Sequence, residues 1–112
     1  MIKATFYKKK GTYFGFSVQG HAEYAEPGSD IICAAVSALT INAVNSLESL
    51  TSDKILLEEN EDGSVKCKVV GNVSPESVLL IRSLQIGLCK IYEEYSSDDD
   101  DSYIKVFFRE VN

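Results

Sequence analysis

The sequence is poor in the residues that build metal sites and disulfide frameworks. Its 112 residues include one histidine, His21, and three cysteines, Cys33, Cys67 and Cys89, with no Cys-x-x-Cys pair. An odd number of cysteines without such a pair is typical of a reducing compartment rather than of a disulfide-linked secreted domain. We therefore expect a cytoplasmic protein with no disulfide framework, no metal site and no cofactor.

Long apolar runs are also absent. Residues 1–10 alternate polar and apolar side chains and lack the continuous apolar segment of a signal peptide. No later stretch reaches the ~18 consecutive apolar residues of a membrane span. The sequence thus predicts no targeting segment and no contact with a membrane.

Basic residues are in the minority. Eleven lysine and arginine residues stand against seventeen aspartate and glutamate residues, which gives a net charge of -6. Because nucleic-acid affinity rests largely on lysine and arginine contacts to phosphate, we expect no direct binding of nucleic acid. The run Lys8-Lys9-Lys10 before Gly11 is interpreted as the solvated tip of a hairpin; a contact to a small anion or to RNA is the alternative.

The rest of the composition is that of an ordinary folded domain. Apolar residues make up 45% and charged residues 25% of the chain, as in soluble globular proteins. A chain of this size buries roughly two-thirds of its unfolded surface, enough for a core without covalent staples. We expect residues 1–112 to form a single domain.

Alternation of apolar and polar residues predicts five strands. They are expected at residues 2–7, 14–19, 54–59, 64–70 and 104–109. In the second strand Phe14, Phe16 and Val18 are expected to share the buried face, and in the fourth strand Cys67 is expected in the core. The sequence at 60–63 is typical of a hairpin turn.

Two helices are expected from apolar residues at helical spacing. The first runs from Ile31 to about Leu50 with Asp30 as N-cap, and the second opens at Ser74 and runs to about Tyr95. The apolar stripe of the first helix comprises Ile32, Ala35, Val36, Leu39, Ala43, Leu47 and Leu50. The apolar surface of the second helix is wider than one sheet face would cover, which indicates either a self-association surface or deep burial.

The order of these elements, ββαββαβ, predicts an α+β fold with a mostly antiparallel sheet and two packed helices. Four consecutive aspartates at 98–101 precede the last strand. Their mutual repulsion favours a solvated linker, and attraction of a basic substrate or partner is the alternative.

Candidate reactive residues are concentrated between Gly20 and Ser37. His21 follows the second predicted strand, and Cys33 lies in the first turn of the first predicted helix, three residues after Asp30. The free N–H groups and the positive dipole end of a helix start favour thiolate over thiol, and a nearby imidazolium acts in the same direction. A reactive cysteine paired with His21 is one interpretation; a small buried cysteine and a surface histidine are the other.

One stretch resembles the signature of a known family. It reads Gly20-His21-Ala22, then, after a loop, Gly28-Ser29-Asp30-Ile31-Ile32-Cys33-Ala34-Ala35-Val36-Ser37. The bacterial ribosomal-processing cysteine proteases carry Gly-His-Ala followed by Gly-x-Asp-Ile-x-Cys-Ala-Ala-Val-Ser. The similarity in length and element order extends to about Arg109. The chain is therefore similar to that family over nearly its whole length.

The resemblance implies a cysteine endopeptidase that removes a short N-terminal extension from a large-subunit bacterial ribosomal protein, the twenty-seventh by name, during ribosome assembly. The partner would then be the N-terminal segment of that precursor. The catalytic dyad of the family corresponds to His21 and Cys33. His21 would take the thiol proton, and the Cys33 sulfur would attack the scissile carbonyl to form a thioester. Backbone N–H groups at the helix start, including that of Cys33, are expected to stabilise the oxyanion.

Three further residues are expected to support this site. Gly20 directly precedes His21. Asp30 is near enough in sequence to orient the imidazole, although capping is its more ordinary use. Ser37 lies one helical turn after Cys33, where it either contacts the substrate or packs.

Two alternatives stay open. The loop at 22–30 is either a lid over a peptide or a plain connector. The protein is either the protease or a non-catalytic ribosome-associated binding module or dimeric adaptor that keeps the motif for structural reasons. A homodimer is expected from the wide apolar surface of the second helix.

Overall fold

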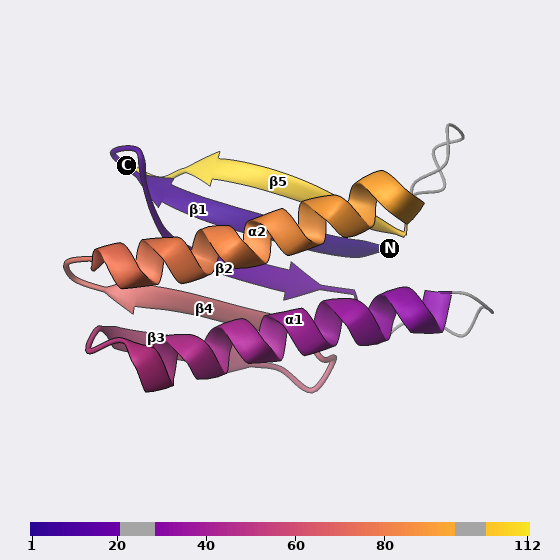
Figure 1. The fold of residues 1–112 in the computed structure, drawn as a ribbon, viewed down its shortest axis with the longest axis horizontal. Helices are drawn as coiled ribbons and strands as arrows, with labels where there is room; N and C mark the ends of the chain where they lie inside the picture. Colours follow the sequence, from indigo (N-terminus) through magenta and orange to yellow (C-terminus); the bar gives the residue numbers. More distant parts are fainter. Residues whose placement is uncertain (21–28, 96–102) are drawn as a thin grey trace.

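A computed structural model of the protein describes residues 1–20, 29–95 and 103–112. His21, most of the loop at 22–30 and the aspartates at 98–101 lie outside the described residues. The elements are β1 (Ile2–Lys9), β2 (Thr12–Gln19), α1 (Ser29–Leu50), β3 (Lys54–Glu59), β4 (Val65–Val70), α2 (Pro75–Tyr95) and β5 (Ile104–Glu110) (Figure 1). The predicted ββαββαβ order and the α+β fold class are confirmed.

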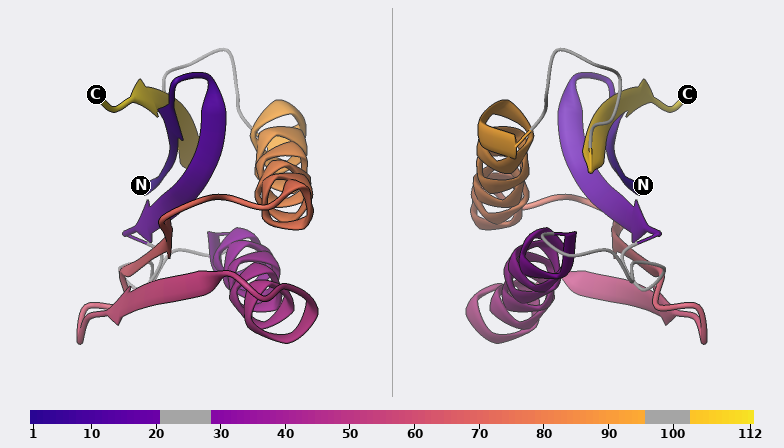
Figure 2. Two further views of the ribbon diagram at one scale, coloured as in Figure 1. Left: turned by 90° about the vertical axis from the view of Figure 1, so that its left-hand side faces the viewer. Right: turned by 90° about the vertical axis from the view of Figure 1, so that its right-hand side faces the viewer.

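The strands form one sheet in the order β3-β4-β2-β1-β5. The pairs β1–β2, β2–β4 and β3–β4 are antiparallel, as expected, and β5 adds to β1 in parallel. Both helices lie on the same face of the sheet and run in opposite directions beside each other (Figures 1 and 2). The fold therefore has two layers, and no helix covers the second sheet face within the part of the chain that the structure describes.

The core lies between the sheet and the helices. Phe6 and Phe16 from neighbouring strands are fully buried with ring centroids 6.3 Å apart. The predicted burial of Cys67 is confirmed. Ile81 and Leu88 of α2 are fully buried in the same cluster. Burial of such side chains is the main favourable contribution to folding, about 2 kcal/mol for each large one.

The apolar stripe of α1 differs from the expected one at its end. Leu50, the last helical residue, is 69% exposed, whereas Thr40 and Val44 are buried. Thr40 tolerates burial because its hydroxyl donates a hydrogen bond of 2.7 Å to the carbonyl oxygen of Val36. The stripe is therefore rotated toward Thr40 and ends at Leu47.

Helix α1 has the length and apolar composition of a membrane-spanning helix over Ile31–Leu50, with a mean hydropathy of 1.5. Core helices pass the same test of length and composition. Buried residues of α1 such as Val36 and Leu47 belong to the core that the strands share. Packing in this core therefore accounts for the buried apolar residues of the helix.

The expected alternation in β2 is wrong at Phe14. Tyr7 pairs with Gly15 and Lys8 pairs with Tyr13, so one residue of β2 has no partner and the register shifts. The extra residue reverses the alternation of the residues before it, while Phe16 and Val18 after it keep their predicted burial. Tyr13 packs against the core, and the Phe14 ring lies beside that of Tyr7, with centroids 6.3 Å apart.

A hydrogen-bonded cluster around Asp53 fixes the start of α2. Asp53 Oδ2 accepts bonds from the Ser77 hydroxyl (2.6 Å), the Ser74 backbone N–H (2.9 Å) and the Ser74 hydroxyl (2.7 Å). Ser74 Oγ accepts in turn from the Ser77 N–H at 3.2 Å, which confirms the predicted opening of the helix at Ser74. The bond from the Ser77 hydroxyl and those from Ser74 lower the pKa of the Asp53 carboxyl.

Asp53→Asn is expected to lower the melting temperature at neutral pH and to flatten its decline in acid. Because the pKa of Asp53 is lowered in the folded state, the carboxylate stabilises the fold fully above its ordinary pKa of 3.8. That stability is lost as the pH falls below this value through the folded pKa. Thermal unfolding between about pH 7 and pH 3 measures the difference, with Glu61→Gln in the exposed β3–β4 turn as control. Parallel pH profiles for wild type and Asp53→Asn would contradict this role.

Candidate active site

The described residues of the predicted site lie at one end of the molecule. Gly20 directly follows β2, and α1 begins at Ser29 at the same end (Figure 1). The antiparallel packing of the helices brings the C-terminal end of α2 to this end as well. The fold therefore brings the two segments that flank residues 21–28 to the same end of the molecule, although His21 itself is not among the described residues.

Gly20 is required by its surroundings. Its φ is +85°, a left-handed value that residues with a side chain rarely adopt, and a Cβ atom built on it would overlap the carbonyl oxygen of Met1. The chain at Met1 is held there from the other side, since the Ile2 N–H donates a bond of 2.9 Å to the carbonyl oxygen of Tyr103. Backbone thus packs directly on Gly20, and this is a structural reason for the glycine before His21.

Cys33 lies near the start of α1 with its side chain half-buried between core and surface. Ser37 follows one turn later on the same side of the helix and is also half-buried. Neither residue is fully buried. The arrangement is that expected of a nucleophile on a rigid element, with a hydroxyl beside it.

The first turn of α1 differs from the prediction. The helix begins at Ser29, two residues before the expected Ile31, so Asp30 lies inside the first turn rather than at the N-cap. Cys33 is then the fifth helical residue. Only the first four N–H groups of a helix lack an intrahelical acceptor. With this boundary the N–H of Cys33 lies one residue beyond the free donors, and its part in stabilising the oxyanion stays a prediction.

The other two cysteines are poorly suited to nucleophilic chemistry. Burial, with a smaller contribution from the charge of Glu48, raises the pKa of the buried Cys67 thiol from 9.0 to about 11. This lowers its thiolate fraction at neutral pH about 100-fold. Burial and the charge of Glu93 also raise the pKa of the half-buried Cys89 thiol. Among the three thiols, only Cys33 lies near a helix start.

Alkylation with iodoacetamide near neutral pH is therefore expected to modify Cys33 first, Cys89 more slowly and Cys67 last. The thiolate is the reacting species, so the raised pKa of the latter two delays them until the pH is well above neutral. Peptide mass spectrometry of time points at about pH 7 and pH 9 measures the order. Modification of Cys67 or Cys89 ahead of Cys33 in the folded protein would contradict it.

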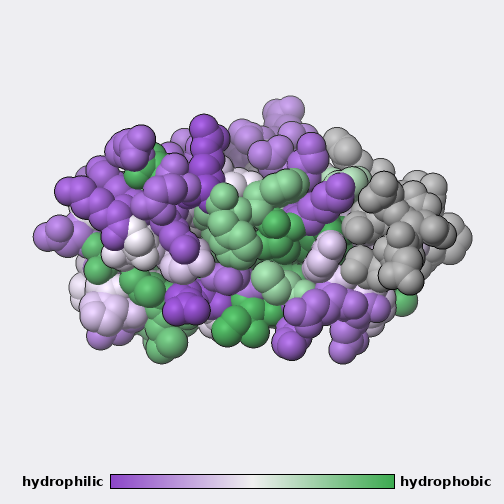
Figure 3. Space-filling model, turned by 90° about the horizontal axis from the view of Figure 1, so that it is seen from above, coloured by the Kyte–Doolittle hydropathy of each residue, from purple (hydrophilic) through white to green (hydrophobic). Residues whose placement is uncertain are grey.

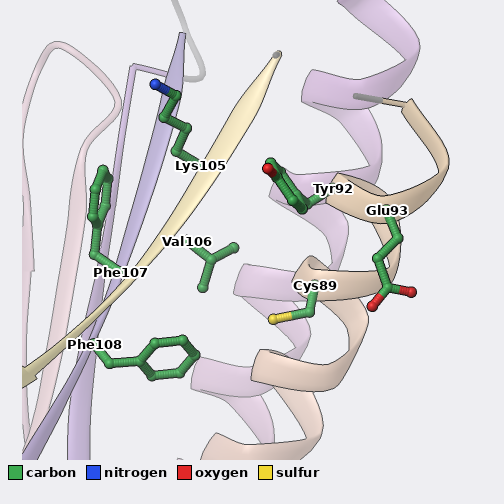
Figure 4. A pocket seen from close by; sticks show the side chains of 7 residues that line it. All are labelled: Cys89, Tyr92, Glu93, Lys105, Val106, Phe107 and Phe108. Carbon is green, nitrogen blue, oxygen red and sulfur yellow. The ribbon is translucent and has the colours of Figure 1, made fainter. Parts of the chain in front are cut away.

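A hollow of about 370 Å³ between α2 and β5 was not predicted (Figure 4). Val106 and Phe108 of β5 point toward α2, where Cys89 and Tyr92 face them. Hydrophobic surface gathers in the middle of the molecule seen from above (Figure 3). Cys33 does not line this hollow, so we assign the hollow no part in the chemistry of that thiol.

Metal ligation has no support among the described residues. No group of three or more His, Cys, Asp or Glu side chains in 1–20, 29–95 and 103–112 could hold a metal ion. A cysteine thiol attacks carbonyl carbon directly once it is deprotonated, so the candidate chemistry of Cys33 is covalent catalysis through sulfur.

Known proteins match the chain over most of its length. The family described as Cysteine protease Prp matches residues 1–99. The ribosomal processing cysteine protease Prp of Bacillus subtilis (strain 168) is 33% identical over 105 residues, which cover 88% of this chain and 93% of the relative. The Gly20 to Ser37 stretch lies wholly within the residues that the family matches.

Solved structures of a relative share the whole fold. The ribosomal processing protease Prp from Staphylococcus aureus in complex with a substrate peptide has a TM-score of 0.85 and 25% identity, covering 97% of this chain and 100% of its own. The same enzyme with a covalently linked product peptide has a TM-score of 0.81 and 26% identity, with the same coverage. Sequence match and fold agree, and the chain belongs to the family of the cysteine protease Prp.

Proposed function

We propose that this protein is a cytoplasmic endopeptidase that removes the N-terminal extension of a large-subunit ribosomal protein, the twenty-seventh by name, during ribosome assembly. Its family is a family of cysteine proteases, and its relatives are named for ribosomal processing. The relative from Staphylococcus aureus binds a substrate peptide and holds a covalently linked product peptide. The observation that carries the proposal is Cys33, half-buried near the start of α1 within the segment that the family matches.

The proposed reaction passes through a thioester. His21 accepts the thiol proton, and the Cys33 sulfur attacks the scissile carbonyl carbon. The imidazolium then returns the proton to the leaving amine, which departs with the mature protein. Water, deprotonated by His21, hydrolyses the thioester between Cys33 and the extension and restores the free thiol. A covalently linked product peptide in a relative supports this type of intermediate.

Three residues support the dyad in this proposal. Gly20 fixes the backbone that leads into His21, because nothing larger fits beside the Met1 carbonyl. Asp30, in the first turn of α1, contributes to orienting the imidazole. Ser37, half-buried one turn after Cys33, contacts the bound peptide.

Self-association through α2 is part of the proposal. Leu79 is 70% exposed and Ile86 57% exposed on this helix, so the alternative of deep burial does not apply to them. With Arg82 and Ser83 they line a shallow hollow of about 380 Å³. Two copies that pack along this surface would cover both apolar side chains. Sedimentation equilibrium tests for the dimer, and a monomer at micromolar concentration would remove this part of the proposal.

The function is tested with a peptide that carries the extension and the first mature residues of the ribosomal protein from the same organism. Incubation with the wild-type protein is expected to give cleavage at a single bond, which mass spectrometry identifies. A peptide with the same composition and a scrambled extension is the control and should stay intact. Binding of the intact peptide without cleavage would overturn the protease in favour of a binding module.

A further inference from the structure

The sheet face opposite the helices carries two rows of side chains in register. Within the described residues no helix lies on this face (Figure 2). Strand pairing places one row across all five strands and a second row beside it. The first row is Arg109, Tyr7, Gly15, Lys68 and Leu56, and the second is Phe107, Thr5, Ser17, Lys66 and Glu58. These rows and their paired neighbours form the open sheet face.

The open sheet face is basic although the protein is acidic. The alternation of side chains along the strands places six of the eleven basic residues on this face: Lys3, Lys54, Lys66, Lys68, Lys105 and Arg109. Among the paired strand residues that point to this side, the one carboxylate is Glu58. The acidic surplus behind the net charge of -6 therefore lies elsewhere in the chain. An extended surface with this charge attracts a polyanion.

Aromatic rings stand among these cations. The Tyr7 and Phe14 rings lie side by side, and Lys66 Nζ stands 5.6 Å from the centroid of the Tyr7 ring. A hydrogen bond of 3.1 Å between the Tyr7 and Ser17 hydroxyls holds that ring in place. Phe107 is 44% exposed and, in Figure 4, points away from α2 toward the open sheet face. Rings beside lysines are the arrangement on which unpaired bases stack while the cations contact phosphates.

A cavity of about 600 Å³ continues the surface at one end. Its lining includes Lys68 and Phe14 from the open sheet face together with Lys9 at the end of β1 and Lys10 of the β1–β2 turn. Lys10 has a left-handed φ of 51°, and Gly11 follows at 79°, which makes the tight turn that presents both lysines. The lysine run at 8–10 thus lies at the tip of the β1–β2 hairpin and is continuous with a larger cationic surface.

We propose that the open sheet face binds single-stranded RNA. An acidic peptide would satisfy the charges but would make no use of the exposed Phe107 ring or of the half-buried Tyr7 and Phe14 rings. Single-stranded RNA offers bases to the rings and phosphates to the lysines. The choice of RNA over DNA rests on the proposed function in ribosomal processing. The expectation of no nucleic-acid binding came from the net charge, which averages over faces of opposite sign. The RNA contact would hold the enzyme near an assembling ribosome while a separate site cleaves.

Fluorescence anisotropy of a labelled 16-nucleotide oligo(U) with the full-length protein tests the proposal. Binding is expected at about 50 mM salt and should weaken steeply toward 200 mM. Lys68→Glu should weaken binding about tenfold. It should also lower the slope of log affinity against log salt concentration by roughly one, the value expected for one lost phosphate contact. Phe107→Ala should weaken binding about tenfold with the salt dependence unchanged, because stacking and not charge is lost. Lys90→Glu on α2, an exposed lysine away from the sheet, is the matched control and should leave the affinity unchanged.

Several results would overturn the proposal. They are no binding at low salt, equal losses for Lys68→Glu and Lys90→Glu, or an unaltered affinity of Phe107→Ala. Displacement of the RNA by polyglutamate of equal charge at equal concentration would indicate an acidic protein partner instead. Tighter binding of an oligo(dT) of the same length would overturn the choice of RNA. Cleavage of the short precursor peptide is measured in the same variants and should be unchanged, which separates this proposal from the proposed protease.

Discussion

Cys33→Ala is expected to abolish cleavage of the precursor peptide and to leave the fold intact. The variant lacks the sulfur that forms the thioester, and removal of a catalytic nucleophile typically lowers kcat by ~1000-fold or more. The fold should tolerate the change, because Cys33 is only half-buried and alanine favours the helix. Mass spectrometry of the peptide products measures the loss, and a thermal melt of the variant checks the fold.

Cys89→Ala is the matched control for this variant. It also removes a half-buried thiol from a helix, but one in α2 whose pKa is raised by burial and by Glu93. It should keep its cleavage activity within about twofold. His21→Ala should lose cleavage as Cys33→Ala does, and should also slow alkylation of Cys33, because the proton acceptor is gone. Cleavage by Cys33→Ala, or an equal loss in Cys89→Ala, would refute the assignment of the nucleophile.

The sequence predicted those features that depend on local periodicity. The alternation at Ile2, Ala4 and Phe6 predicted β1, and the three residues are fully buried as expected. The serine and proline at the start of α2 predicted its opening, because capping depends on residues within one turn. The predicted burial of Cys67 followed from the same two-residue period in β4. The placement of Cys33 on an early turn of α1 was predicted in the same way and is correct to within two residues.

Features that depend on distant partners were missed. The bulge that turns Phe14 away from the core arises where β1 and β2 pair, and nothing in β2 alone marks it. The hydrogen bonds that Ser74 and Ser77 donate to Asp53 span more than twenty residues, and the local sequence around Asp53 does not predict them. The parallel pairing of β5 with β1 likewise depends on how the whole sheet assembles. These are tertiary choices that local pattern does not determine.

The net charge of the chain does not predict the charge of the open sheet face. The net charge of -6 is the sum over the whole chain. Lys66 and Lys68 lie on β4, and Lys3 lies on β1, which is not next to it in the sheet. Only the strand order β3-β4-β2-β1-β5 and the register bring their side chains to one surface. A basic face is therefore visible in the fold and hidden in the composition.

Gly20→Ala is expected to lower kcat/KM about 100-fold and the stability of the fold by roughly 3 kcal/mol. The stability falls for two reasons: the left-handed φ of +85° disfavours a side chain, and the new Cβ meets the Met1 carbonyl oxygen. Relief of that overlap must move the backbone that leads into His21. A displacement of about 1 Å is enough to reduce catalysis by two orders of magnitude.

Gly71→Ala separates the two causes. Gly71 has nearly the same φ, +86°, but no atom lies within 4 Å of the position a Cβ would take. It should therefore lose only about 1 kcal/mol, the cost of the backbone conformation, and should keep its kcat/KM. Urea unfolding and peptide cleavage of both variants measure the two effects. Equal losses in the two variants would mean that backbone strain alone matters. A full loss of activity in Gly20→Ala with stability equal to Gly71→Ala would instead place the effect on the positioning of His21 alone.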